Sequence, residues 1–462
     1  MDPRAKARQP LRQLCEFGEH TACSDANGRR TFADLIATVR LAEDALAAAG
    51  LPERSVVALE VPQSIDGLAA LLACHATRMI ALPLPPGMPA EERAARLRTA
   101  SADGILSGDS RSFQYRSLPD PAPPKATAFS GLEERGAAGL ILFSSGSSGR
   151  PKAMLHDLDA LLGRFVGLRP RNERTLLLLL PDHIGGLDAA FRCLFAGSTL
   201  VLPEARTPQG AGEAIQHHRA TVLPASPTFL NLMLLERIPE RFDCGSLRVI
   251  AYGAEAMPPA LLRRLAAAFP DVDLQQKFGT SETGAVRIKS AARDSLFFSI
   301  TDPGTDWRIV DGELWLKTPA RILGYLNAED NALEADGWYR TGDLAEAGPN
   351  DTLRITGRVD TVINVGGQKV HPAEVEAALA DIPGVAACRV FAREDPVLGQ
   401  TVACEIVSSG ENPPAGWKRH LRRHLRDRLP AWKQPARVTV RETLALNERL
   451  KQAPAGDGRA PE

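Results

Sequence analysis

The sequence predicts an α/β protein: a large N-terminal domain of parallel and mixed sheets with helices, and a small C-terminal α/β domain joined to it by a hinge. Three observations support this prediction. Apolar runs of strand length alternate with amphipathic helical stretches through the first half of the chain, as in parallel α/β sheets. The 462 residues are enough for two or three domains. The character of the sequence changes after Asp360, so we expect domains at residues 1–358 and 359–462, with the hinge near residue 360.

The expected elements follow from hydrophobic periodicity and from turn residues. Helices are expected over residues 32–49, 64–77, 154–165, 259–268, 372–380 and 417–429. Strands are expected over residues 55–61, 79–84, 138–143, 175–180, 199–202, 221–223, 247–252, 314–317, 353–356, 362–365, 385–392 and 400–407. The Pro-rich stretch 120–125 is expected to be a loop or linker, and the pair His217 and His218 a surface loop.

The composition argues against several classes of protein. With 55 basic and 56 acidic residues the net charge is −1, which disfavours a dedicated nucleic-acid binder. No apolar run approaches the ~20 residues needed to cross a bilayer, and the basic N-terminus is not followed by the apolar segment of a signal peptide. The seven cysteines are dispersed without a CxxC pair. This predicts reduced thiols, no zinc site and a cytoplasmic location.

Segment 144–152, with the sequence SSGSSGRPK, has the composition of a phosphate-binding loop. Two glycines permit a tight turn that presents successive N–H groups, and hydroxyl, Arg and Lys side chains add donors and positive charge. The Walker A, GxGxxG and GxSxG patterns are absent. A flexible linker is the alternative, but a position between an expected buried strand and an expected helix favours phosphate binding. The candidate ligands are Ser144, Ser145, Gly146, Ser147, Ser148, Gly149 and Lys152.

Followed closely by His156, this loop resembles the signature of the acyl-adenylate-forming superfamily, which includes acyl-CoA synthetases, adenylation domains of peptide synthetases and luciferases. Further motifs follow in the family's order, so the resemblance covers the chain from about residue 30 to Lys451. The run 278–282 (FGTSE) resembles the family's aromatic-Gly-x-Thr-Glu segment. The resemblance implies that Phe278 stacks on adenine beside Gly279, that Ser281 bonds the α-phosphate, and that Glu282 holds Mg²⁺, a cation that prefers carboxylate and phosphate oxygens.

Motifs nearer the C-terminus resemble the family's ribose, hinge and thiol segments. In 336–343 (DGWYRTGD), the resemblance implies that Asp343 accepts hydrogen bonds from the ribose hydroxyls. In 357–360 (GRVD), Arg358 would lie near the ribose or phosphates and Asp360 would be the pivot. The segment around Gly366, Gly367 and Lys369 resembles the lining of the thiol tunnel.

Lys451 stands where the family has its catalytic lysine, which bridges the attacking carboxylate and the α-phosphate. Here Leu450 replaces the Gly that usually precedes this lysine. An exposed lysine in a terminal tail is the alternative interpretation.

Segment 181–187 (PDHIGGL) resembles the family's His-containing acyl-site segment. Amino-acid-activating relatives place an Asp where this chain has Ile184. A substrate ammonium facing Ile184 would be desolvated without a partner, at a cost of several kcal/mol. We therefore expect a carboxylic acid without an α-amino group, aryl or fatty. The expected lining is His183, Ile184, Gly186, Tyr252, Gly253, Ala254 and Ala285. His183 either gates the acyl tunnel or is a core histidine whose hydrogen bonds are satisfied.

The resemblance implies an ATP-dependent acid–thiol ligase, with Lys451, Glu282 and His183 as catalytic candidates. Such an enzyme activates a small carboxylic acid as acyl-AMP with ATP and Mg²⁺. It then transfers the acyl group to the pantetheine thiol of CoA or of an acyl carrier protein. An o-succinylbenzoate–CoA ligase-like enzyme, a luciferase-type monooxygenase and a non-catalytic acyl-AMP or nucleotide-binding protein are the alternatives. The basic face of helix 417–429 is either a solvated face or a dock for the CoA 3′-phosphate or an acidic carrier protein.

Overall fold

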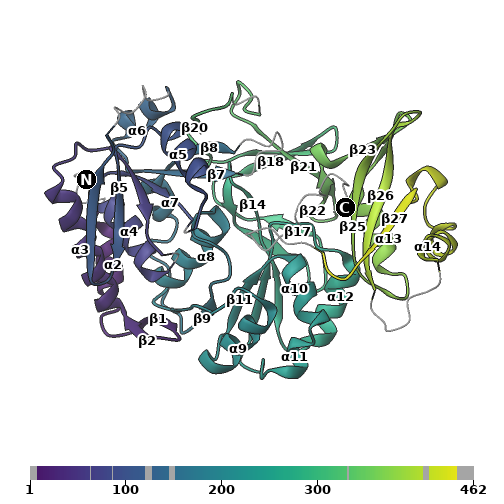
Figure 1. Ribbon diagram of the computed structural model, residues 1–462, viewed down its shortest axis with the longest axis horizontal. Coiled ribbons are helices and arrows are strands. Elements are labelled where there is room, and N and C mark those ends of the chain that lie inside the picture. Colours follow the sequence, from purple (N-terminus) through teal and green to yellow (C-terminus); the bar gives the residue numbers. More distant parts are fainter. Residues whose placement is uncertain are drawn as a thin grey trace. The chain divides into compact units, whose positions relative to one another are not determined.

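The computed structural model describes residues 8–62, 64–85, 87–119, 127–144, 151–329, 332–408 and 416–444. Figure 1 shows the helices and strands of the chain in order along the sequence. The chain divides into two compact units. Unit 1 comprises residues 1–224, 279–286 and 318–334, and unit 2 comprises residues 225–278, 287–317 and 335–462. The expected domain boundary at 358/359 falls inside unit 2, so it stays a prediction.

The first sheet of unit 1 has seven strands in the order β20-β8-β7-β4-β3-β5-β6. Strands β3, β4, β5 and β7 are parallel, and β6, β8 and β20 run antiparallel to their neighbours. Their bounds are β3 (Val56–Glu60), β4 (Ile80–Pro83), β5 (Gly104–Asp109), β6 (Ser112–Ser117), β7 (Gly139–Ser144), β8 (Lys152–Asp157) and β20 (Gly324–Tyr325). Alternate residues of β3 belong to two different core clusters. Both faces of this sheet are therefore buried, as expected for parallel strands.

A second sheet in unit 1 holds the strand order β11-β9-β10-β1-β2. Its strands are β1 (Thr21–Asp25), β2 (Gly28–Thr31), β9 (Arg174–Leu176), β10 (Thr199–Val201) and β11 (Val222–Ala225). The helices of this unit are α2 (Gln9–Cys15), α3 (Phe32–Ala48), α4 (Ile65–Ala76), α5 (Ala90–Thr99), α6 (Ser130–Arg135), α7 (Leu158–Gly163), α8 (Ile184–Phe195) and α9 (Pro208–His218). Helix α3 begins at a reciprocal capping box between Thr31 and Asp34, which satisfies two backbone donors that would otherwise lack a partner.

The first part of unit 2 combines a helical group and an antiparallel sheet. Helices α10 (Pro227–Leu235), α11 (Ile238–Arg241) and α12 (Pro259–Ala268) accompany the parallel pair β12 (Val249–Tyr252) and β13 (Asp273–Gln276). An antiparallel sheet has the order β16-β17-β22-β21-β19-β18. Its strands are β16 (Ile288–Ser290), β17 (Phe298–Ile300), β18 (Asp306–Val310), β19 (Glu313–Lys317), β21 (Tyr339–Ala347) and β22 (Leu353–Arg358). The short strands β14 (Phe278–Thr280) and β15 (Gly284–Val286) follow β13 in the chain, and residues 279–286 of this hairpin belong to unit 1.

The C-terminal part of unit 2 is a small α/β layer with its own core. Its strands are β23 (Ile363–Val365), β24 (Gln368–Val370), β25 (Val385–Asp395), β26 (Gly399–Ser408) and β27 (Arg437–Arg441), and its helices are α13 (Pro372–Ala380) and α14 (Trp417–Leu425). The apolar stripe of α14, formed by Trp417, Leu421 and Leu425, is buried in this core. This arrangement confirms the α/β class with a smaller C-terminal domain.

Most expected elements are found within a few residues, and helices 259–268 and 372–380 have the expected bounds. The helix expected over 154–165 is wrong: residues 152–157 form β8, and only Leu158–Gly163 is helical. The run Ala153–Leu155 is fully buried, and a short run of that kind does not distinguish a buried strand from a helix. The phosphate-loop segment therefore joins two antiparallel strands, not a strand and a helix.

Smaller expectations also differ. His217 and His218 lie in the last turn of α9 instead of a loop, and His218 forms a hydrogen bond with Ser24. Helix α14 ends at Leu425, before the expected residue 429. The Pro-rich stretch 120–125 lies outside the described residues. Among the helices of the described part, none has the length and apolar character of a membrane span.

Candidate active site

The first and last residues of the predicted phosphate loop lie opposite each other on two paired antiparallel strands. Strands β7 and β8 pair so that Ser144 lies opposite Lys152. The other five predicted loop ligands, Ser145, Gly146, Ser147, Ser148 and Gly149, lie outside the described residues. Only Ser144 and Lys152 can therefore be placed, at the base of the loop.

Tyr325 links the lysine of this loop to the predicted magnesium ligand. Strand β20 pairs with β8, which places Tyr325 opposite Met154. The ring centroid of Tyr325 lies 5.2 Å from Lys152 Nζ, and its hydroxyl donates a hydrogen bond of 2.9 Å to Glu282 Oε1. One aromatic side chain thus holds a cation on its face and a carboxylate at its hydroxyl. Sequence analysis gave Tyr325 no role.

The turn between β14 and β15 presents Glu282. Its N–H donates to Thr280 Oγ1 over 3.2 Å, and the Thr283 N–H bonds the same hydroxyl. Ser281 lies beside Glu282 in this turn. The backbone of the predicted phosphate and metal segment is therefore fixed by local hydrogen bonds.

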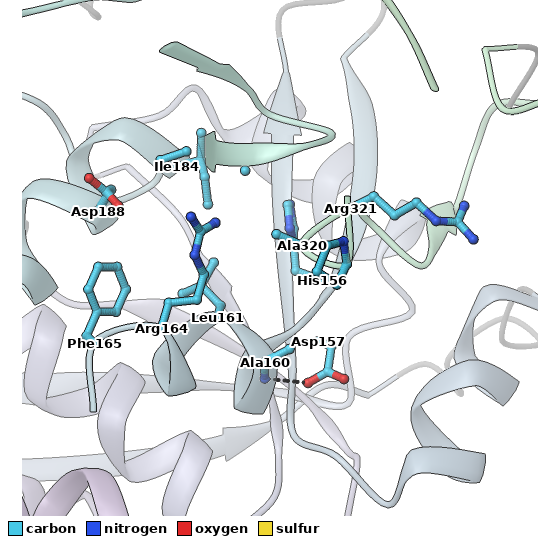
Figure 2. Close-up of a pocket in the computed structure, with 13 residues that line it drawn as sticks. His156, Asp157, Ala160, Leu161, Arg164, Phe165, Ile184, Asp188, Ala320 and Arg321 are labelled. Carbon is cyan, nitrogen blue, oxygen red and sulfur yellow. Dashed lines mark hydrogen bonds between the residues drawn. The ribbon is translucent and has the colours of Figure 1, made fainter. Parts of the chain in front are cut away.

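His156 is buried at the end of β8, with 2 % of its surface exposed. Burial lowers the pKa of its imidazole to about 4, so the ring is neutral near pH 7. Its Nε2 finds no hydrogen-bond partner within the described part of the chain. His156 lines a pocket, shown in Figure 2, that opens between α7, α8 and β15.

Two residues of the predicted acyl lining, Ile184 and Ala285, border this pocket. Figure 2 shows Ile184 across the pocket from the end of α7. The lining comes from the end of β8, from α7 and the residues directly after it, from α8 and β15, and from the segment before β20. These residues are His156, Asp157, Ala160, Leu161, Arg164, Phe165, Ile184, Asp188, Gly284, Ala285, Pro319, Ala320 and Arg321. The structure therefore brings part of the predicted acyl site together and adds Arg164, which sequence analysis did not single out.

His183 and Gly186 have local structural tasks. The Nδ1 atom of His183 accepts a hydrogen bond of 3.1 Å from the Gly185 N–H and so caps α8. A Cβ atom on Gly186 would lie 2.0 Å from the Leu180 carbonyl oxygen. Glycine is therefore required by this close approach, and the acyl-site roles of both residues stay predictions.

The remaining acyl-site candidates, Tyr252, Gly253 and Ala254, belong to unit 2. Tyr252 is 1 % exposed at the end of β12, and burial raises the pKa of its hydroxyl to about 12. Ala254 has a φ of +68°, an uncommon conformation for a residue with a side chain. Their contribution to an acyl pocket stays a prediction.

In unit 2, one arginine joins the predicted ribose ligand to the predicted hinge. Asp343 on β21 lies opposite Arg358 on β22. Arg358 Nη1 donates to Asp343 Oδ1 over 3.0 Å, and Arg358 Nε donates to Asp360 Oδ1 over 3.1 Å. Asp343 is buried, with 8 % of its surface exposed. Three residues proposed for separate tasks therefore form one chain of ion pairs.

Other predicted residues of unit 2 have clear surroundings. The ring of Phe278 is tilted against Phe298, with centroids 5.6 Å apart. Gly366 and Gly367, with φ of +56° and +86°, form the two-residue turn between β23 and β24. Such a hairpin turn needs positive φ at both positions. Lys369 is exposed on β24, and Lys451 lies outside the described residues.

Comparisons with known proteins identify the family. The profile described as AMP-binding enzyme matches residues 11–326, and that of the AMP-binding enzyme C-terminal domain matches residues 374–451. The chain belongs to this family of AMP-binding enzymes. The predicted resemblance is therefore confirmed, as is the class of AMP-forming acid–thiol ligases.

Individual relatives cover nearly the whole chain. A 3-[(3aS,4S,7aS)-7a-methyl-1,5-dioxo-octahydro-1H-inden-4-yl]propanoyl:CoA ligase of Mycobacterium tuberculosis is 28% identical over 94% of this chain and 95% of its own. An indoleacetate–CoA ligase of Aromatoleum aromaticum is 27% identical over 90% of each chain. The solved structure of the amide bond synthetase McbA from Marinactinospora thermotolerans is similar with a TM-score of 0.76 and 25% identity, covering 96% of this chain and 98% of that one.

Proposed function

We propose that this protein activates a carboxylic acid without an α-amino group as acyl-AMP, using ATP, and transfers the acyl group to a pantetheine thiol. The observation that carries the proposal is the convergence of Lys152 and Glu282 on Tyr325. A cation and a carboxylate at the base of a Ser/Gly-rich loop are the groups that a polyphosphate with its divalent cation requires.

In the first half-reaction, a carboxylate oxygen of the substrate attacks the α-phosphorus of ATP. A P–O bond forms as the bond to the bridging oxygen breaks, and pyrophosphate leaves. Lys152 and the loop 144–152 hold the phosphates, Ser281 bonds the α-phosphate, and Lys451 neutralises charge in the transition state. Phe278 packs against the adenine beside Gly279, and Asp343 accepts from the ribose hydroxyls.

Glu282 fits the role of Mg²⁺ ligand. Its carboxylate oxygen is of the type that this hard cation prefers, and the hydrogen bond from Tyr325 fixes the orientation of the carboxylate. Bound there, Mg²⁺ would supply neutralising charge to the phosphates.

In the second half-reaction, the thiol sulfur attacks the acyl carbonyl carbon of the adenylate. A thioester forms, the bond to the phosphate oxygen breaks, AMP leaves and the thiol proton passes to solvent. We propose that Gly366, Gly367 and Lys369 line the thiol tunnel after rotation about Asp360. Because Arg358 bonds both Asp343 and Asp360, it couples the ribose contact to this pivot.

Ile184 supports a substrate without an ammonium group, because its apolar side chain lines the pocket where a counter-charge would be needed. Aryl and fatty acids, including an o-succinylbenzoate-like acid, remain candidates. A non-catalytic nucleotide-binding role is disfavoured, since Glu282, Asp343 and Lys451 are all retained.

The acceptor is CoA or an acidic acyl carrier protein. The exposed face of α14 carries Lys418, Arg419, Arg422 and Arg423, followed by Arg426. Such a face attracts either the CoA 3′-phosphate or an acidic protein by charge complementarity. All seven cysteines are free thiols, which supports the proposed cytoplasmic location.

Pyrophosphate release over a panel of aryl, fatty and amino acids tests the proposal. We expect release with a subset of non-amino acids and thioester formation when CoA or a loaded carrier is added. Asp343→Ala is the matched loss-of-function variant. Adenylate binding without pyrophosphate release would contradict the proposal. Oxygen uptake without a thiol requirement would indicate a monooxygenase instead. Acyl transfer to amines alone would indicate an amide synthetase.

A further inference from the structure

We propose that Arg164 makes the acyl pocket selective for acids whose acyl group carries an acceptor oxygen, a second carboxylate or a keto group, over plain alkyl acids. This inference rests on the proposed function, because it assumes that the pocket beside Ile184 and Ala285 receives the acyl group.

Arg164 follows the C-terminal end of α7, and its side chain extends into the pocket. Arg164 is the C-cap residue of α7, and its half-buried side chain lines the pocket. Figure 2 shows the guanidinium extending from the end of α7 toward Ile184. Its Nη1 lies 3.4 Å from the position of a Cβ on Gly284. The guanidinium therefore lies beside Gly284 at about van der Waals distance.

Most of the surrounding surface is apolar. Leu161, Phe165, Ile184, Pro319 and Ala320 contribute hydrocarbon to the lining. The one imidazole in it, His156, is neutral near pH 7 because burial lowers its pKa to about 4. An arginine in such surroundings is the group most able to discriminate between polar and apolar acyl chains.

The two carboxylates of the lining are engaged with other partners. Asp157 caps α7 by accepting from the Ala160 N–H over 2.9 Å, and it pairs with Arg135 at 3.4 Å. Asp188 pairs with Arg192 at 3.3 Å. The negative charge of each of these two carboxylates is therefore already balanced by an arginine, which reduces its repulsion of a second carboxylate on the substrate.

The chemistry of the guanidinium gives the expected preference. It carries five N–H donors in a planar fork that matches a carboxylate in bidentate geometry. An alkyl chain placed against the guanidinium would supply no acceptor for it. A keto oxygen would accept one hydrogen bond, and a carboxylate would accept two with opposite charge. We therefore expect a graded preference of about 10- to 100-fold in kcat/KM.

Three acids of equal chain length test the inference: pentanoate, levulinate and glutarate. In pyrophosphate-release assays the wild type should prefer glutarate, then levulinate, over pentanoate. Arg164→Met keeps an unbranched apolar side chain and removes the guanidinium with its charge, so it should lose the preference for glutarate and gain activity with pentanoate. Arg164→Lys should retain part of the preference because one ammonium donor group remains.

Arg169→Met is the matched control, because Arg169 is exposed five positions further along and does not line the pocket. Thermal melting confirms that each variant is folded. Equal use of the three acids by the wild type, or an unchanged preference in Arg164→Met, would overturn the role of Arg164 while leaving the proposed function in place. No pyrophosphate release with any acid, in these assays or in the wider panel, would contradict the proposed function and this inference with it.

Discussion

Replacing Tyr325 by Phe tests whether its hydroxyl positions the predicted Mg²⁺ ligand. The substitution removes the donor of the 2.9 Å hydrogen bond to Glu282 and keeps the ring beneath Lys152 Nζ. A hydrogen bond to a charged group contributes roughly 1.5–3 kcal/mol. Tyr325 and Glu282 are only half-buried, so water replaces part of the lost bond. We therefore expect a loss of about 1–2 kcal/mol, roughly 5- to 30-fold in kcat/KM for adenylation.

The assay is pyrophosphate release at varied Mg²⁺ and ATP concentrations. Because a group behind a metal ligand tunes metal affinity, Tyr325→Phe should need more Mg²⁺ for half-maximal activity while its melting temperature stays close to that of the wild type. Tyr115→Phe is the matched control, since Tyr115 lies on β6 at the opposite edge of the same sheet from β20. If the two variants differ by less than twofold in activity and in Mg²⁺ dependence, the role assigned to Tyr325 is wrong.

Four further outcomes are expected. Lys451→Ala should abolish adenylate formation but largely spare thioester formation from supplied acyl-AMP; survival of both steps would show that another residue is the catalytic lysine. Asp360→Pro should keep adenylation and slow thioester formation by orders of magnitude in single-turnover assays, because proline fixes φ, and equal slowing of both steps would exclude rotation about this residue. Charge reversal at Arg422 and Arg426 should weaken carrier-protein loading and its salt dependence while pyrophosphate release is unchanged; equal loading at low salt would make α14 an ordinary solvated helix. Finally, the pKa of buried His156 is about 4 in the folded state, against 6.5 ordinarily. The unfolded chain therefore binds a proton at a higher pH than the folded chain does. The free energy of unfolding should fall by about 3 kcal/mol as the pH drops from 6.5 to 4. His156→Gln should flatten that part of the stability–pH curve in denaturant titrations, and an unchanged slope would mean that other groups cause it.

Local chemistry made several parts of this protein predictable from sequence. Helix α3 (Phe32–Ala48) has a long amphipathic period, a capping box and a glycine after its end, so local and global preferences agree. The order of the motifs around Glu282, Asp343 and Lys451 was enough to indicate the family that the profile matches confirm, and the roles of these three residues stay predictions.

The contacts between distant segments could not be predicted in this way. Tyr325 and Glu282 are 43 residues apart, and Arg358 meets Asp343 because two antiparallel strands place them in register. Strand register depends on which strands become neighbours, and short buried runs such as Ala153–Leu155 fit a strand or a helix equally well. Nothing in the sequence distinguishes Arg164 from the other arginines. Only the structure shows that it follows α7, lies beside Gly284 and lines the pocket.

The sequence by itself determined the family, the α/β class and the order of the chemical motifs, since these reside in residue types and short spacings. The tertiary structure decided which side chains share a site: Lys152 with Tyr325 and Glu282, and Arg164 with the apolar lining around Ile184. The physical reason is that a site is assembled by strand pairing and packing between segments far apart in the chain. The spacing of residues along the sequence does not determine the distances between such segments.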